Sequence, residues 1–440
     1  MASGPETRRF SAAAIVVAVC AAFLLGGWFL KAQCLDPWTG SHQYESLCYN
    51  DIQALYQARG IDQRVFPYVH GSFDEAVGEL RDGAIEYPVL TGLFMYASGA
   101  GVDNANGYLI ASALLLFPFG LLVAFLLARL EGRRALLWGA APALVLYSFH
   151  NWDLLVVAAA VAGFYAYRRD RPVVAAALFA FGAAFKMYPV FFVLPLVVAS
   201  LARRNVREAA AQAGTAAGVF VLVNLPFVIA NSEGWWATYG FHRLRGPNFD
   251  NIWNLRDAFQ VPVDLPALPR FTFGVVLPEL TPERLNLITG ALTLVAFGVA
   301  LWVGWTRARK EGVYPVIAVS AALLAAFLLF TKVHSPQYTL WLLPFFVLVR
   351  VNVLWWVAYA AADLLVYAGV FRFFYDYFER PGATGAETAM EVGVWVRAGL
   401  LAGLFAAFLR AREGAGGERT PTLTSHPLPR VDPVGATAES

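Results

Sequence analysis

The chain has 440 residues, of which 58% are hydrophobic and only 15% are charged, whereas about a quarter of the residues in an average soluble domain are charged. A water-soluble globular fold could not hide this much apolar surface. The net charge of +2 is small and the arginines form short clusters between apolar runs, which argues against a nucleic-acid-binding surface and favours signals of membrane topology.

Apolar runs dominate the chain from residue 10 to residue 409. A transmembrane helix needs about 20 mainly apolar residues, and several of the runs reach this length only with their neighbours. We expect twelve spans, at 10–30, 106–127, 135–149, 154–167, 173–185, 188–201, 209–230, 285–305, 314–330, 338–349, 351–370 and 390–409. A further run, 87–99, is typical of an interfacial or re-entrant helix, and would invert the later orientations if it crossed. The sequence therefore predicts an all-α multi-pass membrane protein.

The basic residues predict the orientation of this bundle. Arg8 and Arg9 precede the first run, which has no Ala-x-Ala-like cleavage site after it and is expected to be a retained anchor. The later clusters all fall on the same side as these two arginines: 129–134, 168–171, 203–207, 307–310, Arg350 and 410–412. By the positive-inside rule this side is cytoplasmic. We expect a plasma-membrane protein with both termini in the cytoplasm, a cytoplasmic segment 1–9, a membrane domain 10–412 and a disordered tail 413–440.

This topology leaves two large extracytoplasmic loops, 31–88 and 231–284, and shorter outward turns near His150, Lys332 and Asp376. Cys34 and Cys48 lie in the first large loop, where an oxidising compartment allows them to form a disulfide. Cys20 lies within the first apolar run and is expected to be a small core residue.

Two carboxylates of the first loop are candidate site residues. Asp51 begins a plausible helix and is able to act as a general base toward a hydroxyl, although a helix N-cap or a solvated loop acid is the ordinary alternative. Glu86 precedes Tyr87 and Pro88, and is either a second site carboxylate or an acid that marks the headgroup boundary.

Ionisable residues at membrane depth are costly and usually face a partner or an aqueous cavity. Lys186 lies at an outward hairpin, where it either meets a phosphate or extends to the interface. For Asp153 we favour an ion pair with a lysine inside the bundle. Asp363, in the eleventh span, has no assigned role.

Two outward segments combine cations with aromatic or hydrogen-bonding groups. The turn 331–338 contains Lys332 and His334 together with Gln337 and Tyr338, a set suited to a lipid phosphate, with Pro336 beginning a new helix. An ordinary capped turn is the alternative. The segment 239–246 adds Arg243 and Arg245, either for phosphate and sugar binding or as part of an interfacial aromatic belt.

These motifs together resemble a known family. Tyr49-Asn50-Asp51-Ile52 with Tyr56, then Glu86-Tyr87-Pro88, Phe185-Lys186-Met187-Tyr188-Pro189, and Lys332-Val333-His334-Ser335-Pro336-Gln337-Tyr338 with Trp341 are similar to glycosyltransferase family 87. Its members are multi-pass GT-C enzymes of actinobacteria, related to polyprenol-phosphate-mannose-dependent mannosyltransferases. The resemblance extends from about residue 8 to 410.

The resemblance implies transfer of a sugar from a polyprenyl-phosphate carrier to a hydroxyl of an envelope lipid or glycan, outside the membrane and with inversion. It implies that Asp51 is the base, and that the phosphate is neutralised by a set of cations, Lys332, His334, Lys186, Arg243 and Arg245. Site support is expected from Glu86, Tyr56, Gln337, Tyr338 and Asp153. Because the first outer loop has no Asp-x-Asp and only Asp74-Glu75, we predict that the enzyme needs no metal and no other cofactor.

The motifs leave the donor and the class of activity open. Mannose is the first candidate for the sugar and arabinofuranose is the second. A transporter or flippase of lipid-linked sugars would use the same basic and aromatic cavity without a catalytic base. No protein partner follows from the sequence.

Overall fold

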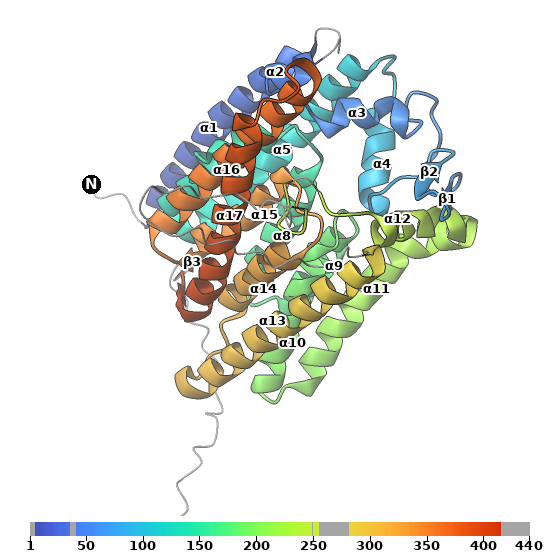
Figure 1. Ribbon diagram of the computed structural model, residues 1–440. Coiled ribbons are helices and arrows are strands. Elements are labelled where there is room, and N and C mark those ends of the chain that lie inside the picture. The colour runs from blue at the N-terminus through green and yellow to red at the C-terminus, as the bar shows by residue number, and fades with distance from the viewer. Residues whose placement is uncertain (1–4, 36–40, 249, 255–280, 415–440) are drawn as a thin grey trace, which may run out of the picture.

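The computed structural model describes residues 5–35, 41–248, 250–254 and 281–414, and it is mainly helical (Figure 1). Within these ranges six helices are long and apolar enough to cross a membrane: α1 (Pro5–Ala32), α5 (Ala105–Glu131), α11 (Val206–Ala230), α13 (Pro282–Glu311), α16 (Val353–Glu379) and α17 (Gly385–Arg410). The helices are those of a multi-pass membrane protein, as the composition predicts.

Most remaining predicted spans are shorter helices. They are α8 (Asp153–Tyr167), α9 (Pro172–Ala183), η3 (Tyr188–Phe192) with α10 (Val193–Ala202), α14 (Val316–Phe330), and η5 (Pro336–Tyr338) with α15 (Thr339–Leu348). At about 1.5 Å per residue, a 15-residue helix covers about 22 Å, less than the roughly 30 Å of a hydrocarbon core. The count of twelve spans thus remains a prediction, with six helices of sufficient length among the described residues.

The short helices are surrounded by protein. Every residue of α15 is buried, and so are most residues of α8 and α14. Helices that are hydrophobic on all sides belong in a core, and a helix enclosed by others does not need the full bilayer length.

Prolines divide some of the apolar runs. The predicted span 135–149 is two short helices, α6 (Leu136–Gly139) and α7 (Pro142–Tyr147). Pro142 begins α7 because the first turn of a helix tolerates its missing N–H. Pro336 begins η5 in the same way, and Pro189 is the second residue of η3. The short run 87–99 forms α4 (Val89–Ser98), whose ten residues are too few to span.

One end of the bundle carries the smaller elements (Figure 1). These are η1 (Gln33–Leu35), α2 (His42–Glu45), α3 (Asp51–Ala58), the strands β1 (Ser72–Asp74) and β2 (Glu79–Arg81), and α12 (Ser232–Leu244). The strands pair antiparallel, with Phe73 opposite Leu80. Phe73 packs with Ala237 of α12 in a small apolar cluster, which fixes the hairpin on this helix.

The opposite end of the bundle brings the basic clusters together. Here η2 (Gly132–Ala135) lies near β3 (Val349–Arg350), which pairs antiparallel with β4 (Arg412–Glu413). Arg134 donates to the carbonyl groups of Phe346, Val347, Val349 and Val351. Arg307 donates to Leu409 and Ala411. The arginines that mark one predicted side also satisfy helix-end carbonyls there.

Glu413, the first residue of the predicted tail, is part of this folded end. Its carboxylate accepts hydrogen bonds from the backbone N–H groups of Ile317 and Ala318 at the start of α14, an arrangement that the helix dipole favours. The rest of the predicted tail, 415–440, lies outside the described residues, as do residues 1–4 of the N-terminal segment and 255–280 of the second large loop.

A disulfide joins Cys34, in η1, to Cys48, just before α3. Both cysteines are buried, and Cys20 is a buried free cysteine of α1. The bond closes a short loop and ties the start of the α3 segment to the end of α1.

Thiol counting tests this bond. Unfolded under non-reducing conditions, the protein should take up one maleimide, at Cys20, and three after reduction. Replacing Cys34 and Cys48 together with serine should lower the free energy of unfolding by about 3 kcal/mol on the chain-entropy model. Three labels before reduction would show that the bond is absent.

Candidate functional site

Asp51 is the first residue of α3, and its carboxylate is not the helix cap. The cap is Asn50, whose side-chain oxygen accepts the Gln53 N–H at 2.8 Å. The Asp51 N–H donates to the His150 carbonyl at 2.8 Å. The N-cap alternative for Asp51 is therefore taken by its neighbour, and the Asp51 carboxylate is left for other contacts.

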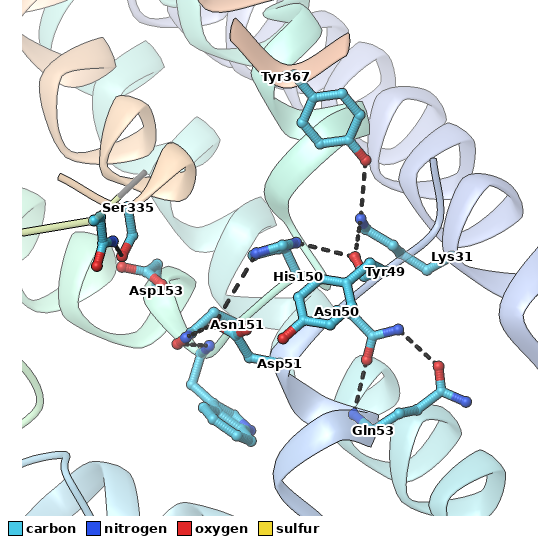
Figure 2. A network of polar contacts seen from close by, with 12 residues as sticks. Lys31, Tyr49, Asn50, Asp51, Gln53, His150, Asn151, Asp153, Ser335 and Tyr367 are labelled. Carbon is cyan, nitrogen blue, oxygen red and sulfur yellow. Dashed lines mark hydrogen bonds and ion pairs between the residues drawn. The ribbon is translucent and has the colours of Figure 1, made fainter. Parts of the chain in front are cut away.

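Asn151 fixes that carboxylate from the connection between α7 and α8 (Figure 2). Its side-chain Nδ2 donates to Asp51 Oδ2 and to the Tyr87 hydroxyl, each at 2.7 Å, which uses both amide hydrogens. The Tyr49 hydroxyl is a further hydrogen-bond partner of Asp51. The Asp51 side chain is still 23% exposed, so solvent reaches it.

The environment of Asp51 changes its basicity. Burial raises the pKa of the Asp51 carboxyl above its ordinary value, while the Asn151 hydrogen bond and the positive charges of Lys186 and Arg245 act in the opposite direction. A raised pKa makes a carboxylate a better proton acceptor, and the neighbouring cations favour its ionised form.

A buried ion pair lies beside this carboxylate. Lys186 Nζ is 2.9 Å from both oxygens of Asp153, with side-chain exposures of 9% and 0%. Trp341 Nε1 donates to Asp153 Oδ1 at 2.6 Å. Lys186 also donates to the side-chain oxygen of Asn151 at 3.3 Å. The expected partner of Asp153 is thus Lys186, and the charge of that lysine is largely compensated within the protein.

Aromatic rings enclose the ammonium of Lys186. Its Nζ lies 5.3 to 5.6 Å from the ring centroids of Tyr87, Tyr338 and Trp341, within cation–π distance. Tyr338 and Trp341 stack at 3.7 Å. Tyr338, an expected support residue, therefore packs on the ion pair.

Lys332 and Arg245 are two cations whose hydrogen-bond partners are neutral. Lys332 Nζ donates to the carbonyls of Arg243 and Arg245, at 3.1 and 2.7 Å, at the C-terminal end of α12. The Arg245 guanidinium donates to Asn248 Oδ1 at 2.6 Å. Neither cation forms an ion pair with a carboxylate of the described residues. Asn248 also donates to Ser335 Oγ and to the Lys332 carbonyl, which joins the two loops.

The other predicted phosphate ligands lie in different surroundings. Arg243 is at the surface, 3.4 Å from Glu75, with both side chains more than half exposed. His334 Nδ1 contacts the Leu328 carbonyl at 2.9 Å, and its buried Nε2 is without a hydrogen-bond partner among the described residues. Burial holds the pKa of His334 well below its ordinary value, so the ring is neutral.

His334 lines a small cavity of about 10 Å³ together with Asp250 and Arg397. Arg397 Nη2 donates to the Asp250 carbonyl at 2.7 Å, and Nη1 lies 3.9 Å from Asp363 Oδ1. Asp363, which the sequence leaves unassigned, belongs to this ion-pair network between α16 and α17.

The remaining predicted support residues stabilise the local fold. Glu86 forms a two-pronged ion pair with Arg59, with N to O distances of 2.5 and 3.0 Å. The Tyr56 hydroxyl donates to the Val102 carbonyl at 2.9 Å. Gln337 is buried in η5. Their predicted functional roles stay predictions.

Three residues near Asp51 are absent from the predicted site: Lys31, His150 and Asn151. His150 and Asn151 are about 100 positions from Asp51 in sequence. The one sequence feature that points to them is that they form a polar pair between two apolar runs.

Within the described ranges no group of three or more His, Cys, Asp or Glu side chains is placed to hold a metal ion, and metal independence remains a prediction.

The buried pair should be sensitive to removal of one partner. Asp153→Asn leaves the Lys186 charge without its counter-ion and should lower the free energy of unfolding by about 3–5 kcal/mol. The control is Glu208→Gln, which breaks the more exposed Arg203–Glu208 pair at 2.9 Å and should cost about 0–1 kcal/mol. Equal losses in thermal or denaturant unfolding would contradict this assignment.

Comparison with known proteins agrees with the motifs. The chain matches the model of glycosyltransferase family 87 over residues 86–336, which is more than half of its 440 residues. The match includes Asn151, Lys186 and Lys332, whereas Asp51 precedes it. No curated protein matches the chain. The chain belongs to glycosyltransferase family 87.

Proposed function

We propose that this glycosyltransferase moves a hexose, with mannose as the first candidate, from a polyprenyl-phosphate carrier to a hydroxyl group of an envelope glycolipid or glycan. One observation carries the proposal: a partly exposed carboxylate, Asp51, lies at the same end of the bundle as two cations without a carboxylate partner among the described residues, Lys332 and Arg245. The carboxylate is able to accept the proton of the acceptor hydroxyl, and the cations are able to bind the phosphate of the carrier.

The reaction follows from this carboxylate and these two cations. Asp51 takes the proton of the acceptor O–H, and the acceptor oxygen forms a bond to the anomeric carbon. The bond between that carbon and the phosphate oxygen breaks, and its electron pair leaves with polyprenyl phosphate. Attack on the face opposite the leaving group inverts the anomeric configuration. The proton stays on Asp51 until it passes to solvent.

Lys332 and Arg245 would stabilise the departing phosphate. Negative charge builds on the phosphate oxygens as the glycosidic bond breaks, and fixed cations there lower the barrier. The carbonyl contacts of Lys332 use two of its three N–H groups. Lys186 is less suited to this role because Asp153 already neutralises it.

The proposed location is the plasma membrane, with both termini in the cytoplasm. The arginine-rich end around β3 and β4 would then be cytoplasmic. The site would face outward, where polyprenyl-linked sugars are used instead of nucleotide sugars.

The first test is sugar transfer by the full chain in nanodiscs, with radiolabelled polyprenyl-phosphate mannose or arabinofuranose and an envelope lipid extract. Asp51→Asn should lower kcat by at least about 100-fold, because it removes the proton acceptor, and should leave binding of the labelled carrier unchanged. The matched control, Asp103→Asn, changes an exposed aspartate of the α4–α5 connection and should transfer at the normal rate.

Two results would contradict the proposal in different ways. Normal turnover by Asp51→Asn would remove Asp51 from the role of base. Binding of both carriers without transfer by the unmodified protein would favour a transporter or flippase of lipid-linked sugars.

The pH profile tests Lys332. Burial and the nearby Arg245 lower the pKa of Lys332 to about 8, so the ammonium charge is present below this pH and is lost above it. The kcat/KM for the donor should fall above pH about 8. Lys332→Arg, whose charge persists beyond pH 12, should move this fall to higher pH, whereas Lys310→Arg on α13 should not. If kcat/KM of Lys332→Arg falls at the same pH as that of the unmodified protein, the fall is caused by another group.

A further inference from the structure

Lys31, in the last turn of α1, is a buried lysine whose hydrogen-bond partners are neutral. Its side chain is completely buried, and its Nζ donates to the Tyr49 carbonyl at 2.8 Å and to the Tyr367 hydroxyl at 3.1 Å (Figure 2). No carboxylate of the described residues forms an ion pair with it. A buried lysine is costly unless its N–H groups are hydrogen-bonded, so these two contacts need an explanation.

The Tyr49 carbonyl has a second donor. His150 Nδ1 lies 3.1 Å from the same oxygen, and a carbonyl has two lone pairs. Since only a protonated Nδ1 is able to donate to a carbonyl, Nε2 of the neutral ring is unprotonated. Burial and the charges of Lys31 and Lys186 lower the pKa of His150 well below its ordinary value, in agreement with a neutral ring. The His150 Nε2 is 4.0 Å from Asp51 Oδ2.

These contacts fix the backbone that carries Asp51. Tyr49 precedes Asp51 by two residues, Cys48 is bonded to Cys34, and the Asp51 N–H donates to the His150 carbonyl at 2.8 Å. The direction of the Asp51 side chain depends on the orientation of the peptide groups just before it. The Tyr49 carbonyl, in the peptide group that precedes the Asn50 cap, is held from two sides.

We propose that Lys31 and His150 are positioning residues that hold the Tyr49 carbonyl between two donors and thereby orient the Asp51 carboxylate toward the acceptor hydroxyl. This inference rests on the proposed function, because it assigns a role toward the same base. Neither residue takes the substrate proton. Their contribution is to geometry, where a misplacement of about 1 Å at a reacting group costs up to about 100-fold in rate.

The test compares variants that remove or keep each donor in the full chain in nanodiscs. Lys31→Met and His150→Leu should each lower kcat by about tenfold or more, with the donor KM within about twofold, because the ground-state contacts of the carrier lie elsewhere. His150→Asn places an amide nitrogen near the position of Nδ1 and should recover kcat to within about threefold. Lys31→Arg keeps a charged donor and should recover part of the loss. The control, Lys310→Met, changes an exposed lysine of α13 and should behave as the unmodified protein.

Full kcat in Lys31→Met and His150→Leu would overturn the proposal. A His150→Asn variant as slow as His150→Leu would also overturn it, since Nε2 beside Asp51 would then be the working atom. If Lys31→Met does not accumulate, the two His150 variants decide. The Asp51→Asn variant distinguishes failure of the proposed function from failure of the positioning role. Normal turnover by Asp51→Asn would show that Asp51 is not the base. An inactive Asp51→Asn together with fully active Lys31 and His150 variants would contradict only the positioning role.

Discussion

The buried ion pair between Lys186 and Asp153 is the contact on which the rest of the site depends. Asp153 begins α8 and Lys186 follows α9, so the pair closes the hairpin that these helices form. Two charges out of water are stable only when every remaining group is also bonded, and Trp341 and Asn151 supply those bonds. The contact from Lys186 turns the Asn151 oxygen away from Asp51, which leaves the amide nitrogen to face the carboxylate. A structural pair inside the bundle therefore sets the hydrogen bonding of the proposed base.

Much of the architecture follows from hydropathy, and the site follows only in part. The six long helices, the helix start at Pro336 and the Cys34–Cys48 pairing are local or compositional features, because each depends on a run of residues or on a compartment. Asp51 was identified through its motif. His150 and Asn151 were not, because their role arises from contacts across about 100 residues. Periodicity carries no information about such distant pairs when the helices involved are apolar on every face.

The predicted phosphate-binding cations also show what the sequence does not predict. Sequence places Lys186, Lys332, His334, Arg243 and Arg245 in one class, and the fold gives them different electrostatic states. Asp153 neutralises Lys186, Glu75 accompanies Arg243 at the surface, and burial keeps His334 neutral. Lys332 and Arg245 have carbonyl and amide partners instead. Whether a charge is available to a substrate is thus decided by its partner, which is a tertiary property.

The neutral partners of Lys332 and Arg245 also explain how a site is able to hold an anion and then release it. A carbonyl or amide oxygen satisfies a cation's hydrogen bonds without cancelling its charge, so the positive potential persists before a phosphate arrives. A carboxylate partner, such as Asp153 beside Lys186, would have to be displaced at the cost of an ion pair. With dipoles as partners, exchange between carbonyl and phosphate costs little in either direction. The same molecule therefore uses ion pairs where it needs rigidity, at Lys186, and dipolar partners where we propose that a charged group enters and leaves.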